Sequence, residues 1–411
     1  MNQASGGPPS KLHRTLTLPW LIFYGVGVTV GAGIFALIGE ILLLAGDAAP
    51  MSFLIAGVVA GATAVSYALL VRVYPVAGGD AVFVSRGIGP FFGRLAGIAV
   101  AAIGVISSAV IALAFAGYAG TLIPLPQPVL VTVVVAGLAA LACWGVRESV
   151  AFAAAITILE VGTLIVVIAA GIPLLSDLPA ATAIAGFDTG LASMAPVVAG
   201  ALIAFFAFIG FEDIENLAEE TIEPERAAPR AILWTLVITV VLYVLLALVA
   251  ISAPGREEIT GSQAPLAILF EQTTGIDRVP VAAMAAIAMV NGILVQILMG
   301  ARTLYGMAHE RLLPMWFGAV LDSRRTPARA TIAVAGLTLI LALAFPLVRL
   351  AEATSLIVLT VFALVNLSLY ALGARNAHAS LRRWRHWGLF GAALCLAILG
   401  WTVATSLNIA N

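Results

Sequence analysis

Long runs of apolar residues, separated by short polar segments, fill the chain from residue 18 to residue 408. A helix needs roughly 20 mostly apolar residues to cross a bilayer core about 30 Å thick. On this criterion the pattern predicts eleven membrane-spanning helices, at residues 18–45, 52–73, 92–118, 128–146, 150–175, 195–221, 229–253, 279–307, 328–346, 350–372 and 387–408. We therefore expect an all-α membrane protein.

Basic residues are distributed unevenly between the loops on the two sides of these spans. Short cytoplasmic loops carry an excess of Lys and Arg. With the N-terminus inside, Arg256, Arg278 and Arg349 fall outside, whereas the other 17 of the 20 basic residues fall inside. The distribution predicts a cytoplasmic N-terminal tail at residues 1–14. Because the number of spans is odd, it also predicts an external C-terminus.

The first span contains four glycines, Gly25, Gly27, Gly31 and Gly33, within nine residues. Each glycine costs up to about 1 kcal/mol in a helix interior. The pattern therefore predicts local unwinding at residues 31–33. An interruption at membrane depth is tolerated only beside protein or a water-filled cavity. Close packing of helices through small residues is the alternative interpretation.

The sixth span contains a counterpart, in which Gly210 precedes the adjacent acids Glu212 and Asp213. Two carboxylates at this depth are costly in a continuous lipid-facing helix. The unpaired amides at the start of a new half-helix stabilise negative charge. We expect a second interruption at this point, with the two acids acting as helix caps or in a gate.

The two interruptions each open a set of five spans, at residues 15–175 and 193–372, with one further span at 386–408. Because five is odd, the two sets have opposite topology, which predicts a five-plus-five inverted repeat. Irregular helices at corresponding positions of inverted repeats point to the binding site of a transporter. We place this site where spans 1 and 6 cross.

Composition narrows the class of protein further. The chain is 62% hydrophobic and only 10% charged, and its net charge is −1. Soluble domains are about half apolar and a quarter charged, and no basic run indicates a nucleic-acid partner. The two cysteines and four histidines show no metal-ligand spacing, so we expect neither a metal nor a cofactor. Since no histidine lies inside a span, an intramembrane enzyme is disfavoured.

Glu160 lies midway along the fifth span. An acid at the bilayer centre costs at least about 2.5 to 3.5 kcal/mol unless it is paired, hydrated or protonated. We predict that Glu160 binds and releases a coupling proton. A structural hydrogen bond from a permanently protonated Glu160 is the alternative. Sodium coupling, with oxygens from Thr157 and Glu160, is a further one.

Other polar residues near the spans have less specific interpretations. Glu219 and Glu220 precede Arg226 and Arg230, which predicts a charge network acting as a gate or a structural clamp. In the eighth span we expect the isolated amides Asn291 and Gln296 to hydrogen-bond a neighbouring helix, with a place facing the cavity as the alternative.

Several ordered motifs resemble those of the amino acid, polyamine and organocation (APC) superfamily, and of its bacterial amino acid permeases in particular. They are Gly31-Ala-Gly-Ile-Phe35, Tyr74-Pro-Val-Ala-Gly-Gly79, Phe206-Ala-Phe-Ile-Gly-Phe-Glu212, Ala218-Glu-Glu220 with Pro224, Arg226 and Pro229, and Ala301-Arg302 with Leu313-Pro314. The resemblance implies the five-plus-five fold in a cell membrane. It covers residues 13 to 370, and this chain has eleven spans where many members have twelve.

The resemblance also implies how a substrate is held. Its carboxylate would meet the amides of Ala32, Gly33 and Ile34 after the break at Gly31, as anions do at a helix N-terminus. Its amino group would meet carbonyls around Val28, Thr29, Phe206, Ala207 and Ile209, before the break at Gly210. Phe206 corresponds to the aromatic gate of similar transporters, or simply packs, and Phe205 and Phe208 would line or seal the pocket.

These observations predict a secondary active transporter for an amino acid, coupled to protons. Exchange of amino acids or polyamines is the first alternative, and a channel or receptor is another. Inverted repeats with two interrupted helices favour alternating access over a channel or receptor. The expected partners are the substrate, a proton and the lipid bilayer. The sequence determines neither the substrate nor the oligomeric state.

Overall fold

The computed structural model describes residues 14–76, 78–145, 150–177, 191–309, 311, 313–321, 326–375 and 378–409. Residues 1–13 of the expected N-terminal tail lie outside this part. Within the described residues the chain is helical and has two isolated β-bridges but no strand. The expectation of an all-α protein is confirmed for these residues.

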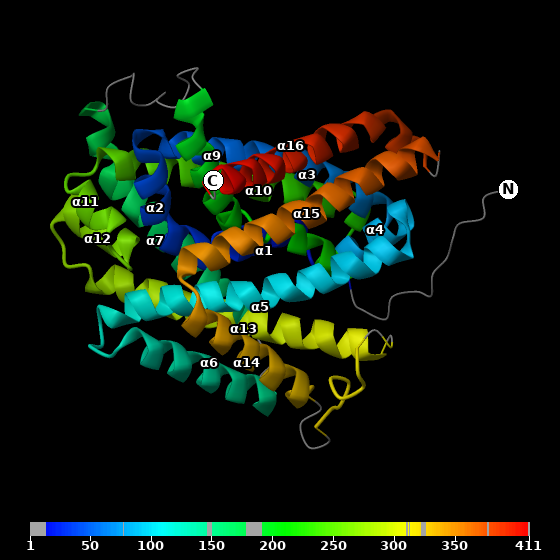
Figure 1. Ribbon diagram of the computed structural model, residues 1–411, viewed down its shortest axis with the longest axis horizontal. Helices are drawn as coiled ribbons and strands as arrows, with labels where there is room; N and C mark the ends of the chain where they lie inside the picture. Colours follow the sequence, from blue (N-terminus) through cyan, green and yellow to red (C-terminus); the bar gives the residue numbers. More distant parts are fainter. Residues whose placement is uncertain are drawn as a thin grey trace.

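The helices follow one another along the chain as labelled in Figure 1. They are α1 Leu18–Thr29, α2 Ala32–Ala45, the 3₁₀ helix η1 Gly46–Ala48, α3 Ala49–Val73, α4 Gly79–Ile88, α5 Pro90–Gly120, α6 Gln127–Trp144, α7 Val150–Gly171, η2 Ile172–Asp177, α9 Leu191–Ala207, η3 Phe211–Glu220, α10 Pro224–Ser252, α11 Arg256–Thr260, α12 Pro265–Thr274, α13 Val279–His309, α14 Ala328–Ala344, α15 Leu347–Ala374 and α16 Ala379–Ile409.

Nine helical runs in the described residues are long and apolar enough to cross a membrane, and one of them, Ala32–Val73, joins α2, η1 and α3. The apolar helices α1 and α14 are shorter than these runs. This result confirms a multi-pass membrane protein. Helix boundaries lie within a few residues of the predicted ones for most spans, but α16 begins at Ala379, eight residues before the predicted start at 387.

Most of the long helices run along the length of the molecule, with α6 and α14 side by side at one edge (Figure 1). Large apolar side chains such as Val133 of α6, Ile158 of α7 and Ile340 of α14 are exposed. Lipid solvates such a surface, whereas water does not. The outer faces of these helices are therefore suited to contact with acyl chains.

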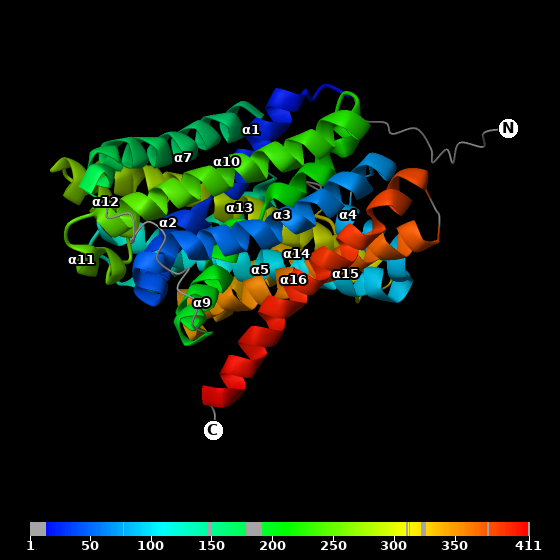
Figure 2. The ribbon, with the colours of Figure 1, turned by 90° about the horizontal axis from the view of Figure 1, so that it is seen from above.

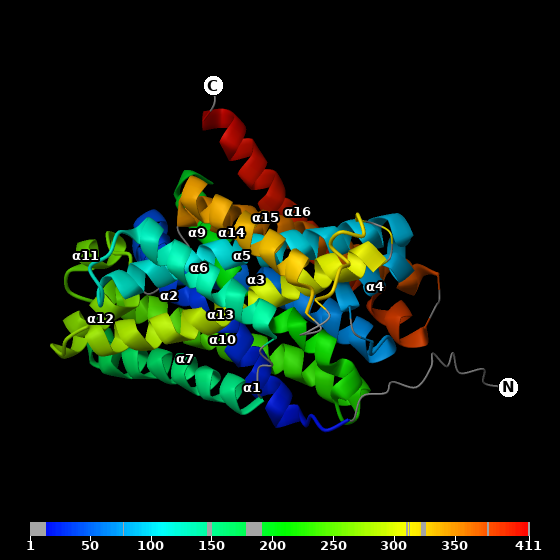
Figure 3. The same cartoon turned by 90° about the horizontal axis from the view of Figure 1, so that it is seen from below.

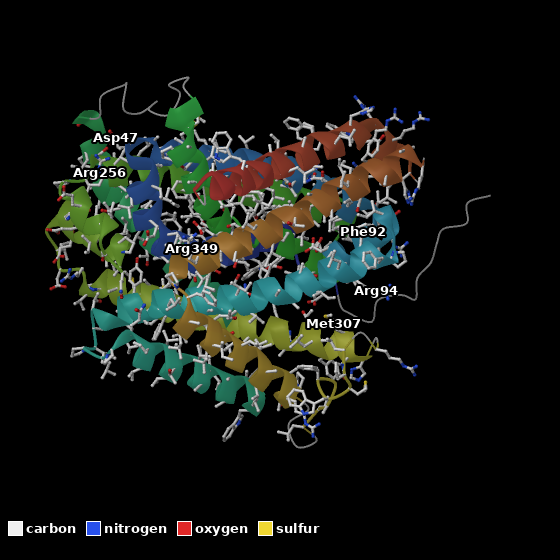
Figure 4. The ribbon with its side chains drawn as sticks, viewed as in Figure 1. Asp47, Phe92, Arg94, Arg256, Met307 and Arg349 are labelled. Carbon is white, nitrogen blue, oxygen red and sulfur yellow. The ribbon has the colours of Figure 1, made fainter. Side chains whose placement is uncertain are left out.

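Charged side chains mark the two ends of the bundle (Figure 4). Asp47 forms an ion pair with Arg256 at the end that holds α11 and α12. Arg94 lies toward the opposite end, near α4. We refer to these as the α11–α12 end and the α4 end. Helices α4, α11 and α12 are not among the predicted spans.

The C-terminal helix α16 packs on α15 and α3 over its first part and then projects from the bundle (Figures 2 and 3). The Trp387 ring N–H donates a hydrogen bond to the Ala62 carbonyl at 2.8 Å. Glycines allow the close approach, because a Cβ on Gly391 would lie 2.3 Å from Asn366 Oδ1. Asn366 in turn accepts a hydrogen bond from Ser66 Oγ at 2.6 Å.

Candidate substrate site at the two helix interruptions

The first helix interruption separates α1 from α2. Helix α1 ends at Thr29, α2 begins at Ala32, and Gly31 between them is extended (φ −87°, ψ −157°). The N-cap residue of α2 is Gly31, which has no side chain that could cap the helix. The first amides of a helix have no partner within it, so Ala32, Gly33 and Ile34 present amides with a positive partial charge to a ligand.

The second interruption separates α9 from η3. Helix α9 ends at Ala207, and Gly210 adopts φ 125°, a region that only glycine occupies readily. The Gly210 amide donates a hydrogen bond to Glu212 Oε2 at 2.9 Å. Glu212 therefore binds the turn between the two helices, as a cap does.

The two interruptions contact one another. A Cβ on Gly33 would lie 2.9 Å from Ala207 Cα, and a Cβ on Gly210 would lie 3.0 Å from Val28 Cγ1. Each break therefore needs its own glycine to leave room for the end of the other helix. The polar backbone at both breaks is thus brought to a common point inside the bundle.

Tyr243 of α10 joins the ends of the two helices. Its buried hydroxyl lies 2.8 Å from the Thr29 carbonyl oxygen and 2.8 Å from that of Ala207. A single O–H proton serves both carbonyls, which the helices themselves leave without partners. Tyr243 is not among the residues predicted from the sequence. A tyrosine in the middle of a span could have indicated such a contact, because a buried hydroxyl needs a hydrogen-bond partner.

A cavity of about 160 Å³ adjoins both interruptions. Nine of the predicted residues line it: Val28, Thr29, Gly31, Ala32, Gly33, Glu160, Phe206, Ala207 and Ile209. Four others, Ile34, Phe205, Phe208 and Gly210, are not among its lining residues. Phe205 packs against Phe362 and Phe208 against Tyr243, with ring centroids 5.7 Å and 5.1 Å apart.

Residues from α1, α5, α7 and α13 complete the wall. They are Tyr24 and Gly27, Ser107 and Ile111, Ile156 and Thr157, and Asn291, Gly292, Val295 and Gln296. Of the two interpretations of the amides Asn291 and Gln296, the structure supports the cavity. The contribution of α5 was not predicted, because Ser107 lies in a run of small residues without any distinguishing pattern.

Helix α7 brings Glu160 to this cavity through a close contact with α1. A Cβ on Gly27 would lie 2.1 Å from Thr157 Oγ1, so only glycine allows the two helices this separation. Glu160 is 7% exposed and is the only charged residue among the described residues that line the cavity. An acid in this position has access to a bound solute but no basic neighbour in the wall.

A second cavity of about 60 Å³ lies toward the α4 end and shares Ile209 and Gln296 with the first. Asp80, Glu212 and Asp213 line it. The predicted acids Glu212 and Asp213 therefore meet a third carboxyl group, that of Asp80 in α4. The two cavities therefore adjoin one another, and carboxyl groups line the second.

Helix α4 is held in place by the acidic helix η3. The Asp80 amide donates a hydrogen bond to Glu215 Oε1 at 3.0 Å, and the Gly78 amide donates one to Asn216 Oδ1 at 3.0 Å. Tyr67 donates its hydroxyl proton to Asp80 Oδ1. Burial raises the pKa of Asp80 to about 6, and the Tyr67 hydrogen bond opposes this shift.

The segment around Glu219 and Glu220 also anchors the start of α1. The Thr15 and Leu16 amides donate hydrogen bonds to the Glu220 carbonyl at 2.9 and 3.0 Å. Arg226 forms its ion pair with the exposed Glu223 at 3.5 Å. Exposed pairs of this kind contribute little to stability. The start of α1 is therefore held to the end of η3 chiefly by backbone hydrogen bonds.

At the α11–α12 end, α11 and α12 pack against α2 and α5. The Tyr118 hydroxyl donates a hydrogen bond to the Phe35 carbonyl at 2.7 Å and accepts one from the Leu266 amide of α12 at 3.2 Å. A Cβ on Gly39 would lie 2.8 Å from the Ile259 carbonyl oxygen of α11. These contacts hold α11 and α12 against the bundle beside α2.

Comparison with known proteins identifies the family. The amino acid permease family profile matches residues 15–409. An uncharacterized transporter of Mycobacterium tuberculosis is 32% identical over 370 residues, which cover 89% of this chain and 82% of the relative. The branched-chain amino acid permease of Lactococcus lactis is 27% identical, with 89% and 83% covered.

The vacuolar cationic amino acid transporter 4 of Arabidopsis thaliana is 29% identical over 381 residues, which cover 87% of this chain and 63% of the relative. The profile match spans nearly the whole chain, including all the helices that form the cavity. It confirms the predicted resemblance to the APC superfamily. The chain is a member of the amino acid permease family.

Proposed function

We propose that this chain is a secondary active transporter that moves an amino acid across the cell membrane by proton symport and alternating access. The observation that carries the proposal is a single cavity lined by both interrupted helices in a member of the amino acid permease family. Relatives named as a branched-chain amino acid permease and as cationic amino acid transporters support this substrate class.

The proposed site matches the two charged groups of an amino acid. The substrate carboxylate binds the amides at the start of α2, in Ala32, Gly33 and Ile34, next to Gly31. The amino group binds the carbonyls that end α1 and α9, around Val28, Thr29, Phe206, Ala207 and Ile209. Phe205, Phe208 and Gly210 do not line the cavity and support the residues that do. Phe206 also covers the bound substrate.

Glu160 is the proposed site of the coupling proton. It lines the substrate cavity and has no basic residue beside it there. An isolated buried carboxylate is costly, whereas the neutral acid is not. A proton that binds Glu160 while the site is accessible from one side, and leaves on the other, couples substrate movement to the proton gradient.

We further propose the topology that this mechanism needs. It comprises eleven spans, with inverted repeats at residues 15–175 and 193–372 and a final span at 386–408. The N-terminus is cytoplasmic and the C-terminus is external. Support comes from nine long apolar runs, the shorter apolar helices α1 and α14, and the corresponding places of the two interruptions. Glu212, Asp213, Glu219 and Glu220 then lie toward the cytoplasm, where movement of η3 opens the path.

Uptake into liposomes by the purified full-length chain tests the proposed function. We expect accumulation of at least one labelled amino acid from a panel that includes polyamines, driven by an inward proton gradient. Glu160→Gln should abolish accumulation but retain exchange, because glutamine cannot carry the proton. Glu40→Gln removes an acid that does not line this cavity and should leave accumulation intact.

A second variant tests the location of the site. Gly33→Val should abolish uptake, since even the first added carbon would lie 2.9 Å from Ala207 Cα. Gly336→Val is the matched control, because a Cβ there meets nothing within 4 Å. Full gradient-driven accumulation by Glu160→Gln would refute the coupling role. Undiminished uptake by Gly33→Val would refute the site.

A further inference from the structure

The charge of the substrate cavity is unbalanced. Glu160 is the only charged residue among the described lining residues, and none of them is a lysine, arginine or histidine. The other titratable groups beside the cavity are phenols, Tyr24 of α1 in the wall and Tyr243 of α10, whose hydroxyl bonds the carbonyls of the lining residues Thr29 and Ala207. The lining residues from α13, which are Asn291, Gly292, Val295 and Gln296, are all uncharged. A positive charge must therefore come from outside the protein.

One polar atom of the wall lacks a partner. Asn291 Oδ1 is buried and accepts no hydrogen bond from the residues that the structure describes. A buried acceptor left unpaired is unfavourable. Because the oxygen belongs to a residue that lines the same cavity as Glu160, a donor inside the cavity can satisfy it.

The backbone at the interruptions does not supply the missing charge. In the proposed function, which this inference extends, it matches the carboxylate and the amino group of the substrate. A neutral amino acid bound in this way leaves Glu160 uncompensated. Closing the cavity around an unpaired carboxylate is strongly unfavourable. A bound proton or a second cationic group on the substrate removes the difficulty.

We propose that Glu160 and Asn291 form a subsite for one positive charge, occupied by a proton with a neutral amino acid and by the side-chain cation of a dibasic amino acid. Asn291 Oδ1 accepts a hydrogen bond from protonated Glu160 in the first case and from the substrate ammonium or guanidinium in the second. One positive charge crosses per substrate in both cases. Only the neutral substrate brings a proton.

The adjoining cavity supports a path for cations. Its wall includes Asp80, Glu212 and Asp213 and shares Gln296 and Ile209 with the substrate cavity. No basic residue is among its described lining residues. A substrate that carries a net positive charge therefore meets complementary charge on the way to the α4 end.

The test measures proton and charge movement separately. The full-length chain is reconstituted in liposomes that contain a pH-sensitive dye, with a potassium diffusion potential set by valinomycin. Labelled leucine and labelled lysine are the two substrates. We expect an interior-negative potential to accelerate the uptake of both. Leucine should acidify the lumen by about one proton per molecule, and lysine should not acidify it.

Variants assign the effect to the subsite. Glu160→Gln should make leucine uptake independent of potential and proton-free, and should lower lysine uptake roughly tenfold or more, as loss of a buried charge partner does. Asn291→Leu should raise the lysine concentration needed for half-maximal uptake more than the leucine concentration. Glu40→Gln, which removes the same charge outside this cavity, should resemble the unmodified chain.

Each contrary result has a distinct meaning. Acidification during lysine uptake, leucine uptake without proton movement, or uptake confined to one of the two substrates overturns the shared subsite while leaving amino acid transport in place. Equal effects of Asn291→Leu on both substrates overturn the role of Asn291. Absence of uptake and exchange for every amino acid refutes the proposed function instead.

Discussion

At the scale of single residues, the hydroxyl of Tyr243 shows how two interrupted helices are kept together. It hydrogen-bonds the terminal carbonyls of α1 and α9 from a third helix, at the point where Gly33 and Gly210 let the breaks meet. These carbonyls are also the proposed partners of the substrate amino group. Tyr243 therefore fixes the spacing of groups that a ligand would have to match.

Tyr243→Phe removes this hydroxyl without changing the ring that packs against Phe208. We expect the free energy of unfolding to fall by about 1 to 3 kcal/mol, the cost of leaving buried polar groups unpaired. Unfolding in detergent measures the change. Tyr370→Phe is the control, since Tyr370 is only partly buried and no hydrogen bond of its hydroxyl is present in the described part of the chain. Equal stability of the two variants would contradict this role.

At the scale of elements, the short helix α4 depends on its contact with η3. Glu215 and Asn216 accept hydrogen bonds from backbone amides at its first turn. A Cβ on Gly79 would lie 1.9 Å from Glu215 Oε2, so this approach requires glycine. Acidic groups near a helix N-terminus are stabilising. Glu215 and Asn216 of η3 thus hold the first turn of α4 in place.

The pKa of the Asp80 side chain gives the stability of this region a pH dependence. Burial raises the pKa from the ordinary value of 3.8 to about 6, so the folded state prefers the protonated carboxyl. The stabilising contribution is therefore complete below the ordinary pKa and is lost as pH rises through about 6. We expect Tm to fall between about pH 4 and pH 6, and to fall less in Asp80→Asn.

The measurement is Tm in detergent across this range for the unmodified chain and for two variants. Glu257→Gln, which removes an exposed acid at the α11–α12 end, should keep the full pH dependence. If Asp80→Asn loses stability with rising pH as steeply as the unmodified chain, another carboxyl group is responsible.

At the scale of the whole molecule, α16 is attached through its first part, where residues from Leu381 to Ile398 are buried against the bundle. Gly388 and Gly391 pack against Asn366 of α15, and Trp387 bonds the backbone of α3. Beyond this region the helix leaves the bundle (Figure 2). The position of the last helix therefore depends both on this polar contact and on the buried side chains of Leu381, Cys395 and Ile398.

Gly391→Ala should separate α16 from α15, because the added Cβ would lie 2.3 Å from Asn366 Oδ1. We expect a lower Tm and faster proteolysis between α15 and α16. Gly400→Ala is the control, because it makes the same substitution in the same helix at a position where the added Cβ meets nothing within 4 Å. Since alanine favours helices over glycine, that control should be as stable as the unmodified chain or more so. Similar losses in both variants would mean that Gly391 is not a packing position.

Local sequence was sufficient for the class of the protein and for the position of the breaks. Apolar runs long enough for a bilayer identify membrane helices wherever they occur. Clustered glycines beside Glu212 and Asp213 mark backbone that a continuous helix in lipid would not favour. Both signals come from neighbouring residues, so they do not require knowledge of which helices meet.

Contacts between residues of different helices could be identified only from the tertiary structure. The approach of Thr157 to Gly27 brings Glu160 to the cavity, and the capping of α4 by Glu215 brings Asp80 to Glu212. Tyr243 reaches both breaks from α10. These contacts join residues far apart in the chain and depend on the rotation of each helix. The sequence alone determined which segments enter the membrane and where they break, and packing determined which side chains surround the space between them.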